Sequence, residues 1–278
     1  MGLSDDTIKN TDKALRVLDK NTDLNDPEQV KTYIANHNAS NGYKRNLTIA
    51  YTKYARQEGI QWDKPKYHEQ AKIPKIPTTE KLKMIIAKSG RILGTMLTLS
   101  METGLRPVEL CSLKAKDIDI EQRTIHPTTA KHGKPRALKI SQSTAQLLQE
   151  HIIRKNLTEN DQLFRMDSSD YGEQFRKLRN KLAEKLHDPT IHAIRLYDLR
   201  HYFASMTYNK TRDILLTKAL MGHKKLETTE IYIHLINYND DEWTCKTASN
   251  VTEATQLIEA GFEYVTEMDG LKLFKKRK

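Results

Sequence analysis

A stretch rich in proline and lysine, residues 64–78 (KPKYHEQAKIPKIPT), most constrains the fold of this chain of 278 residues. Its three prolines lack the amide N–H that helices and sheet interiors use, so no regular element is expected to run through it. The stretch also has few large apolar side chains, which is typical of an interdomain linker. The sequence therefore predicts a domain at 1–63, a second at 79–240 and a C-terminal extension at 241–278.

The first domain is predicted to be a small helical unit. Asp26-Pro27-Glu28 is a strong helix start, with a capping aspartate, proline at the first helical position and an acid in the first turn. A third helix, ending at Gly59, carries several tyrosines that we interpret as core or boundary residues rather than as stacking platforms for bases.

The second domain is predicted to be mainly helical with one small β insertion. Apolar residues recur at helical spacing from 85 to 99, and Gly104 suits a helix C-cap. Further helices are expected at 141–156, 168–187, about 194–209, 213–221 and 225–236.

Strands are expected within this domain and again at the end of the chain. Short strands fit Asp117–Ile120, Arg123–Pro127 and Pro135–Ile140, the last two joined at a turn that includes Gly133. From residue 251 a helix is followed by a predicted β-hairpin that turns at Asp269-Gly270.

Positive charge is concentrated in one part of the sequence. The formal net charge is +10, and residues 71–140 hold 14 Lys or Arg against 6 Asp or Glu. A polyanion is the natural partner, because neutralised phosphates release counterions, and Lys75 in the linker could follow a DNA backbone. A solubilising basic surface is the alternative.

Several classes of site and location are not indicated by the composition. Cys111 and Cys245 are the only cysteines, so neither a disulfide framework nor a Cys/His zinc site is expected. No apolar stretch approaches the ~20 residues that span a bilayer. We therefore expect no membrane association and a cytoplasmic, nucleoid-associated protein.

Three residues near the end of the second domain suggest phosphodiester chemistry. Arg200 is followed 23 residues later by His223 and, nine residues after that, by Tyr232. The arginine offers a fork of donors for a phosphate, the histidine a further donor, and the tyrosine a nucleophile that could hold the phosphate covalently. Singly, these residues could be an ion-pair partner, a helix cap and a core tyrosine.

Upstream residues add cations to this candidate site. Arg106 falls at a loop-to-helix boundary suited to a phosphate, and Glu109 could orient it from the same helix face. Lys131 lies just before the tight turn of the predicted hairpin, where it could reach into a groove and protonate a leaving oxygen. Lys134 and Arg136 on the same hairpin are candidate DNA contacts.

Taken together, these motifs resemble those of the tyrosine recombinase (integrase) family over roughly residues 75–238. TGLRPVEL resembles the first arginine box, TAKHGKPR the β-hairpin lysine, YDLRHYFASM the second arginine box, and MGHKKLETTEIYIH the histidine-to-tyrosine box. The resemblance implies a mainly α fold with a small antiparallel β-sheet, in which a helical core-binding domain and a helical catalytic domain clamp duplex DNA. The extension after 240 is similar to tails on archaeal integrases.

The resemblance also implies a reaction. Tyr232 would attack a scissile phosphate to give a 3′-phosphotyrosyl link and a free 5′ hydroxyl. Arg106, Arg200 and His223 would stabilise the developing charge, and Lys131 would protonate the leaving oxygen. No metal or nucleotide cofactor is implied, and the active species would be a homotetramer on DNA that is a monomer or dimer when free.

One position departs from the family pattern. The second arginine box usually reads His-x-x-Arg, and here the first position is Tyr197, whose hydroxyl is a poor base at its usual pKa of about 10. This leaves open which group deprotonates Tyr232. His201 is the next residue after Arg200, but a helix would turn it away by ~100°, and we expect it to be structural.

Three other functions compete with a site-specific recombinase. A type IB topoisomerase would share the chemistry but relax supercoils as a monomer. A catalytically impaired, integrase-derived DNA-binding protein is the alternative that Tyr197 favours. A metal-dependent nuclease would need a carboxylate cluster, and none is evident.

Overall fold

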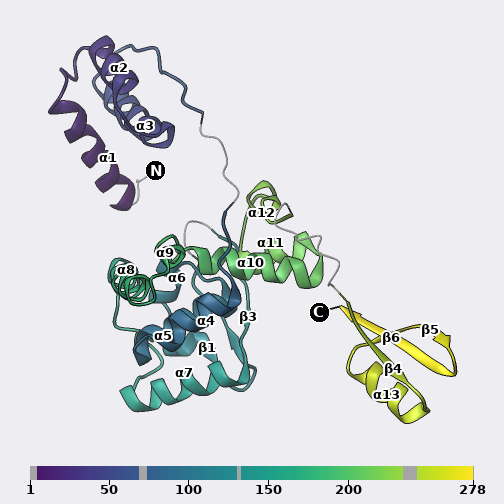
Figure 1. The fold of residues 1–278 in the computed structure, drawn as a ribbon. Coiled ribbons are helices and arrows are strands. Elements are labelled where there is room, and N and C mark those ends of the chain that lie inside the picture. The colour runs from purple at the N-terminus through teal and green to yellow at the C-terminus, as the bar shows by residue number, and fades with distance from the viewer. Residues whose placement is uncertain (1–4, 69–73, 130–132, 234–242, 278) are drawn as a thin grey trace. The chain divides into compact units, whose positions relative to one another are not determined.

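The structure, a computed structural model, describes residues 5–68, 74–129, 133–233 and 243–277. The chain divides into two compact units, residues 1–72 and 73–278, which are treated separately (Figure 1). Among the described residues no helix is long and apolar enough to cross a bilayer.

The first unit is a bundle of three helices: α1 (Asp5–Asp19), α2 (Pro27–Asn36) and α3 (Asn41–Gln57). The predicted start of α2 is confirmed, because the Asp26 side chain accepts hydrogen bonds from the backbone N–H groups of Glu28 and Gln29. Tyr51 is fully buried and donates its hydroxyl to the carbonyl of Leu24 at 2.9 Å, so it is a core tyrosine as expected.

Part of the predicted linker belongs to this first unit. Tyr67 packs against its core, and Lys44 Nζ lies 5.9 Å from the centre of the Tyr67 ring. The ordered packing of the unit thus continues past residue 63, and residues 69–73 lie outside the described part of the chain.

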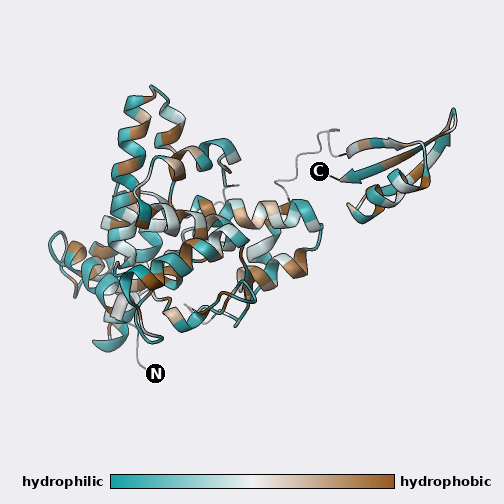
Figure 2. Cartoon of the chain, turned by 90° about the horizontal axis from the view of Figure 1, so that it is seen from below, coloured by the Kyte–Doolittle hydropathy of each residue, from teal (hydrophilic) through white to brown (hydrophobic). Residues whose placement is uncertain are grey.

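The second unit is built mainly of helices. They are α4 (Thr79–Ala87), α5 (Arg91–Thr103), α6 (Pro107–Cys111), α7 (Gln142–Lys155), α8 (Ser168–Lys185), α9 (Pro189–His192), α10 (Asp198–Thr211), α11 (Ile214–Met221) and α12 (Glu227–Glu230). Hydrophobic and hydrophilic residues alternate along the helices in Figure 2, as expected for helices that bury one face. α12 is much shorter than the predicted helix at 225–236, whose last residues lie outside the described part.

A small antiparallel sheet interrupts these helices. Its strands are β1 (Ile118–Asp119), β2 (Thr124–Ile125) and β3 (Leu138–Lys139), in the order β1-β2-β3. Three strands are found where three are predicted, but each is only two residues long. Ile125 pairs with both neighbours and is fully buried, which fastens the sheet to the core.

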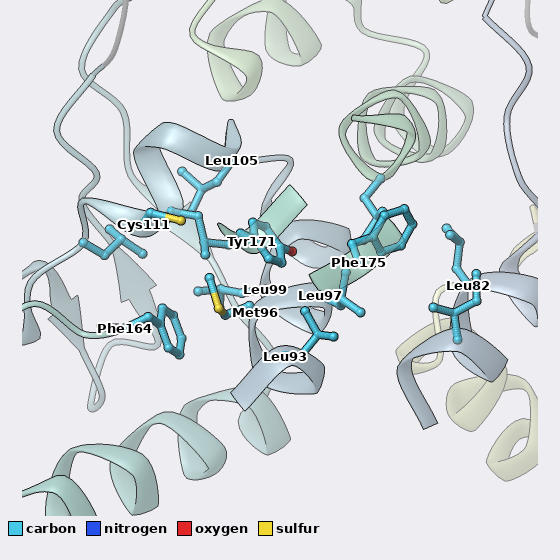
Figure 3. Close-up of a cluster of buried hydrophobic side chains, with 14 of the residues drawn as sticks. Leu82, Leu93, Met96, Leu97, Leu99, Leu105, Cys111, Phe164, Tyr171 and Phe175 are labelled. Carbon is cyan, nitrogen blue, oxygen red and sulfur yellow. The ribbon is translucent and has the colours of Figure 1, made fainter. Parts of the chain in front are cut away.

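Helix α5 lies at the centre of the second unit and packs against α4, α6, α7, α8 and α10. Leu93, Met96, Leu97 and Leu99 of α5 are buried in a cluster shared with Tyr171 and Phe175 of α8 (Figure 3). The Tyr171 hydroxyl lies 3.0 Å from Ser100 Oγ, so the one polar atom of this ring has a partner within the core.

The C-terminal extension has its own sheet, with strands β4 (Trp243–Ala248), β5 (Glu263–Met268) and β6 (Leu271–Arg277) in the order β4-β6-β5, and a helix α13 (Val251–Glu259). The predicted helix and hairpin are confirmed. Asp269 and Gly270 both have positive φ, as a tight two-residue hairpin turn requires. The strand β4 was not predicted.

Replacing Phe175 with alanine should destabilise the second unit. Phe175 is 1% exposed in the α5–α8 core, and removing a buried phenyl ring typically costs about 3–5 kcal/mol. Urea denaturation should show an earlier unfolding transition for this unit. Leu147→Ala on α7 is the control, because Leu147 is 40% exposed and its loss should leave the transition nearly unchanged. Equal midpoints for the two variants would contradict the assigned core.

Candidate active site

The structure brings together four of the five residues predicted for catalysis. Arg106 is the N-cap of α6, Arg200 lies in α10, His223 follows α11 and Tyr232 follows α12. The charges of Arg106 and Arg200 both act on His223, and the charge of Arg200 also acts on Tyr232. Lys131 lies outside the described residues, so its place in the site stays a prediction.

Arg106 is held at the start of α6 by Glu109. Its backbone N–H donates to Glu109 Oε2 at 3.0 Å, and its Nη1 donates to Glu109 Oε1 at 2.7 Å. Pro107 at the first helical position fixes where the helix begins. The predicted orientation by Glu109 is present, and the Arg106 side chain keeps 18% of its surface exposed.

Glu109 is fully buried and binds a second arginine. Arg136 Nη2 donates to Glu109 Oε2 at 2.7 Å. Burial acts to raise the pKa of Glu109, but hydrogen bonds from Arg136 and from the backbone of Arg106, with both positive charges, lower it to about 2. The carboxylate is therefore ionised throughout the physiological pH range.

We predicted Arg136 to be an exposed DNA contact, but the structure places its side chain away from the surface. Its side chain is 3% exposed and is drawn inward by the Glu109 carboxylate. Its Nε and Nη1 atoms are buried with no hydrogen-bond partner in the described part of the chain. Lys134 and Lys75 are exposed, which suits contact with a DNA backbone, and that role stays a prediction.

Arg200 is the centre of the site and is 1% exposed. Its Nη1 donates to the carbonyl of Gly104, and its Nη2 donates to the carbonyl of Met221 at 2.6 Å. Nη2 also lies 3.1 Å from His223 Nε2, whereas Nε is buried with no partner among the described atoms. Burial and then the charge of Arg106 lower the Arg200 pKa to about 10, so the group stays cationic at neutral pH.

Two glycines with a left-handed backbone conformation end the helices whose C-terminal carbonyls bind Arg200. Gly104 (φ 61°) caps α5 and Gly222 (φ 62°) caps α11, where the last carbonyls of each helix lack helical partners. A Cβ on Gly104 would lie 2.4 Å from Phe203 Cδ1, and one on Gly222 would lie 2.8 Å from Arg136 Nη1. A side chain at Gly104 would therefore clash with Phe203 of α10, and one at Gly222 would clash with the Arg136 guanidinium.

His223 is fixed by bonds from both ring nitrogens. A guanidinium only donates, so His223 Nε2 accepts from Arg200, and Nδ1 is left to donate to Thr229 Oγ1 at 2.9 Å. Burial and the nearby charge of Arg200 lower the His223 pKa to about 4. In this arrangement Nε2 carries no proton, so donating to a phosphate would require His223 to exchange its bond to Arg200.

Tyr232 is 2% exposed and packs against Ala204 of α10 and Met221 of α11. Its hydroxyl oxygen lies 3.0 Å from Nδ1 of His201. Burial raises the Tyr232 pKa, and the charge of Arg200 offsets only part of that rise. The hydroxyl is therefore protonated near neutral pH and needs a base before it can act as a nucleophile.

His201 is the site residue that the sequence reasoning missed. It does follow Arg200 around the helix, but Tyr232, which comes after α12, places its hydroxyl 3.0 Å from the His201 ring. Tyr197 at the N-terminus of α10 is 43% exposed, and its ring meets the His201 ring edge-on with centres 5.3 Å apart. No motif spacing could reveal this contact, because it depends on the path of a segment 31 residues further on.

No group of three or more His, Cys, Asp or Glu side chains that could hold a metal ion occurs among residues 5–68, 74–129, 133–233 and 243–277. Among the predicted site residues that the structure describes, Glu109 is the one that carries a negative charge, and it lies between Arg106 and Arg136.

Glu109→Gln should destabilise the second unit. The neutral amide leaves Arg106 and Arg136 without a counter-charge, and breaking a buried ion pair costs about 3–5 kcal/mol. Because the folded-state pKa lies below the unfolded one, Glu109 stabilises the fold above about pH 4.5, and this is lost as the pH falls toward 2. Urea unfolding of wild type and variant should therefore differ most near pH 7 and converge on acidification.

The matched control for that experiment is Glu173→Gln, which removes an exposed pair with Lys177 on α8. This variant should unfold like the wild type at every pH. A Glu109→Gln protein as stable as the control would contradict the role given to the buried carboxylate.

Known proteins share the arrangement of these elements. The Tn1549 transposon integrase, solved in complex with transposon right end DNA, superposes with a TM-score of 0.65 at 18% identity, covering 93% of this chain and 94% of that one. A lambda integrase dimer bound to a core site gives 0.64 at 16% identity, covering 87% and 92%. These likenesses confirm the predicted fold class, mainly helical with small antiparallel sheets.

Relatives are also found by sequence. Tyrosine recombinase XerA of Saccharolobus solfataricus is 33% identical over 141 residues, which covers 51% of this chain and 45% of the relative. XerA of Pyrococcus furiosus is 29% identical over 237 residues, covering 77% and 74%. The match thus spans about half the length of the first relative and three quarters of the second.

The phage integrase family matches residues 78–238, a stretch that holds every residue predicted for catalysis. That match covers more than half of the sequence and agrees with the motifs and with the fold. The chain is a member of the phage integrase family.

Proposed function

We propose that this protein cuts and rejoins duplex DNA at specific sites through a covalent link to Tyr232. The observation that carries the proposal is the buried Arg200, which binds His223 directly and acts electrostatically on Tyr232 within one unit. Family membership and relatives that are named tyrosine recombinases support the same reaction.

The proposed steps use the side chains as they are arranged. Tyr232 attacks the scissile phosphate, forming a 3′-phosphotyrosyl bond and releasing a 5′ hydroxyl. Arg106, through its exposed part, and the unpartnered Nε of Arg200 stabilise charge on the non-bridging oxygens, with His223 as a further contact. Lys131 protonates the leaving oxygen. The phosphotyrosine conserves the bond energy, so resealing needs no nucleotide cofactor.

Duplex DNA is the proposed partner, with the helical unit at residues 1–63 completing a clamp around it. The surplus of basic residues at 71–140 supports this, as do exposed Lys75 and Lys134. The DNA-bound form would be a homotetramer that holds two sites, with free protein as monomer or dimer. The proposed location is the cytoplasm, in association with DNA.

Tyr232→Phe should abolish the covalent protein–DNA adduct, because phenylalanine has no nucleophilic oxygen. The measurement is an SDS-resistant adduct on nicked suicide duplexes cut from the DNA that flanks the gene, with Tyr264→Phe in the C-terminal extension as the control. An adduct formed by the Tyr232→Phe protein would refute the assignment. No adduct from the wild type under any condition would favour a DNA-binding protein without cleavage activity.

Arg106→Ala should lower the cleavage rate about 10²–10³-fold, the range seen when one preorganised donor is removed from an active site. Binding of the same duplex should weaken much less, since one contact among many is lost. Arg136 still neutralises Glu109 in this variant, so the protein should remain folded. Parallel loss of binding and cleavage would instead make Arg106 a general DNA contact.

A further inference from the structure

The Tyr232 hydroxyl has a specific partner whose chemistry the proposed reaction requires. His201 Nδ1 lies 3.0 Å from the Tyr232 oxygen, and the two rings are tilted by 51° with centres 5.9 Å apart. Building on the proposed function, we propose that His201 is the general base, which accepts the Tyr232 proton during cleavage and returns it during resealing.

His201 has the right protonation state for this role. Burial, which is the largest effect, and the charges of Arg195 and Arg200 lower its pKa below the ordinary value, against an opposing effect of Asp198. Among the described residues, the groups that act on it or contact it are these three charged side chains and the rings of Tyr197 and Tyr232. At neutral pH the imidazole is therefore uncharged, and Nδ1 can accept the phenolic hydrogen when Nε2 carries the ring proton.

The other candidates for the base are less suitable. Both ring nitrogens of His223 are already engaged, Nε2 by Arg200 and Nδ1 by Thr229. Tyr197 occupies the position where the family usually has histidine, but a phenol with an ordinary pKa of about 10 is a poor base at neutral pH. Its ring instead packs edge-on against His201 and limits the orientations that the imidazole can take.

The proton balance of the reaction closes with His201 in place. During cleavage the bond between Tyr232 Oη and phosphorus forms, the bond between phosphorus and O5′ breaks, and the phenolic proton passes to Nδ1 to give an imidazolium. The leaving O5′ takes its proton from a separate acid, for which Lys131 is proposed. During resealing the 5′ hydroxyl returns its proton to that separate group, for which Lys131 is proposed, as O5′ bonds to phosphorus. The bond between phosphorus and Tyr232 Oη breaks, and the imidazolium returns its proton to Oη.

The same hydrogen bond could instead hold Tyr232 away from DNA in the free protein, since the residue is 2% exposed. These two roles predict opposite effects. Loss of a base slows cleavage, whereas loss of a restraint on the nucleophile accelerates it, so one set of variants distinguishes them.

The decisive variants are His201→Asn and His201→Ala. Asparagine places an oxygen near the position of Nδ1, so it preserves a hydrogen-bond acceptor without being a base at neutral pH. Single-turnover cleavage of nicked suicide duplexes from the gene-flanking DNA should slow at least ~10²-fold in both variants. The wild-type rate should rise with pH, with a midpoint below the ordinary histidine pKa, and then level off, whereas the variant rates should keep rising into the alkaline range. Imidazole in the buffer should restore part of the His201→Ala rate.

His192→Asn on α9 is the matched control, because this histidine is exposed and should leave rate and pH profile unchanged. A His201→Asn protein with wild-type rate and profile, or with faster cleavage, would overturn the assignment of His201 as the base and leave the proposed function standing. Absence of any adduct from the wild type would overturn the proposed function and this proposal with it.

A measurement on the free protein tests the starting geometry without DNA. The ¹⁵N NMR spectrum of the His201 ring should show an unprotonated Nδ1 and a protonated Nε2 at neutral pH, and Tyr232→Phe should shift the Nδ1 resonance. A protonated Nδ1 would mean that His201 donates to Tyr232, which would overturn its role as the base.

Discussion

The buried guanidinium of Arg200 is the interaction on which the rest of this site depends. From α10 it joins the carbonyl ends of α5 and α11 and the imidazole of His223, which follows α11, so it links three helices that are separate in the sequence. A buried cation is tolerated only where acceptors satisfy it, and the free carbonyls and negative dipole ends of two helices supply them. The fold therefore fixes the position of the Arg200 guanidinium, where we propose that a phosphate binds.

The site places three arginine side chains near one another, and one buried carboxylate offsets part of their positive charge. Arg106, Arg136 and Arg200 act on one another, and Glu109 neutralises only part of their combined charge. The unpartnered nitrogens of Arg136 and Arg200 are donors that the described part of the protein does not satisfy. In the proposed reaction, a bound phosphate would supply negative charge and hydrogen-bond acceptors to these groups.

Local chemistry made much of this structure predictable. The cap at Asp26, the turn at Asp269-Gly270 and the order of Arg200, His223 and Tyr232 each follow from residues close in sequence or from a fixed spacing. Tertiary pairings were not predictable in this way. The sequence around Arg136 predicts an exposed hairpin residue. Its burial depends on an ion pair with Glu109, which is 27 residues away.

His201 shows how a correct local rule led to an incomplete expectation. The ~100° step between successive helical residues does separate His201 from Arg200, as the sequence suggests. Because Tyr232 packs against Ala204 of α10, that step instead directs the histidine toward the Tyr232 hydroxyl. In the proposed reaction two adjacent residues of one helix thus have different tasks: Arg200 stabilises phosphate charge, and His201 accepts the phenolic proton. With these tasks divided, the position of Tyr197 is free to hold an aromatic ring that supports the base.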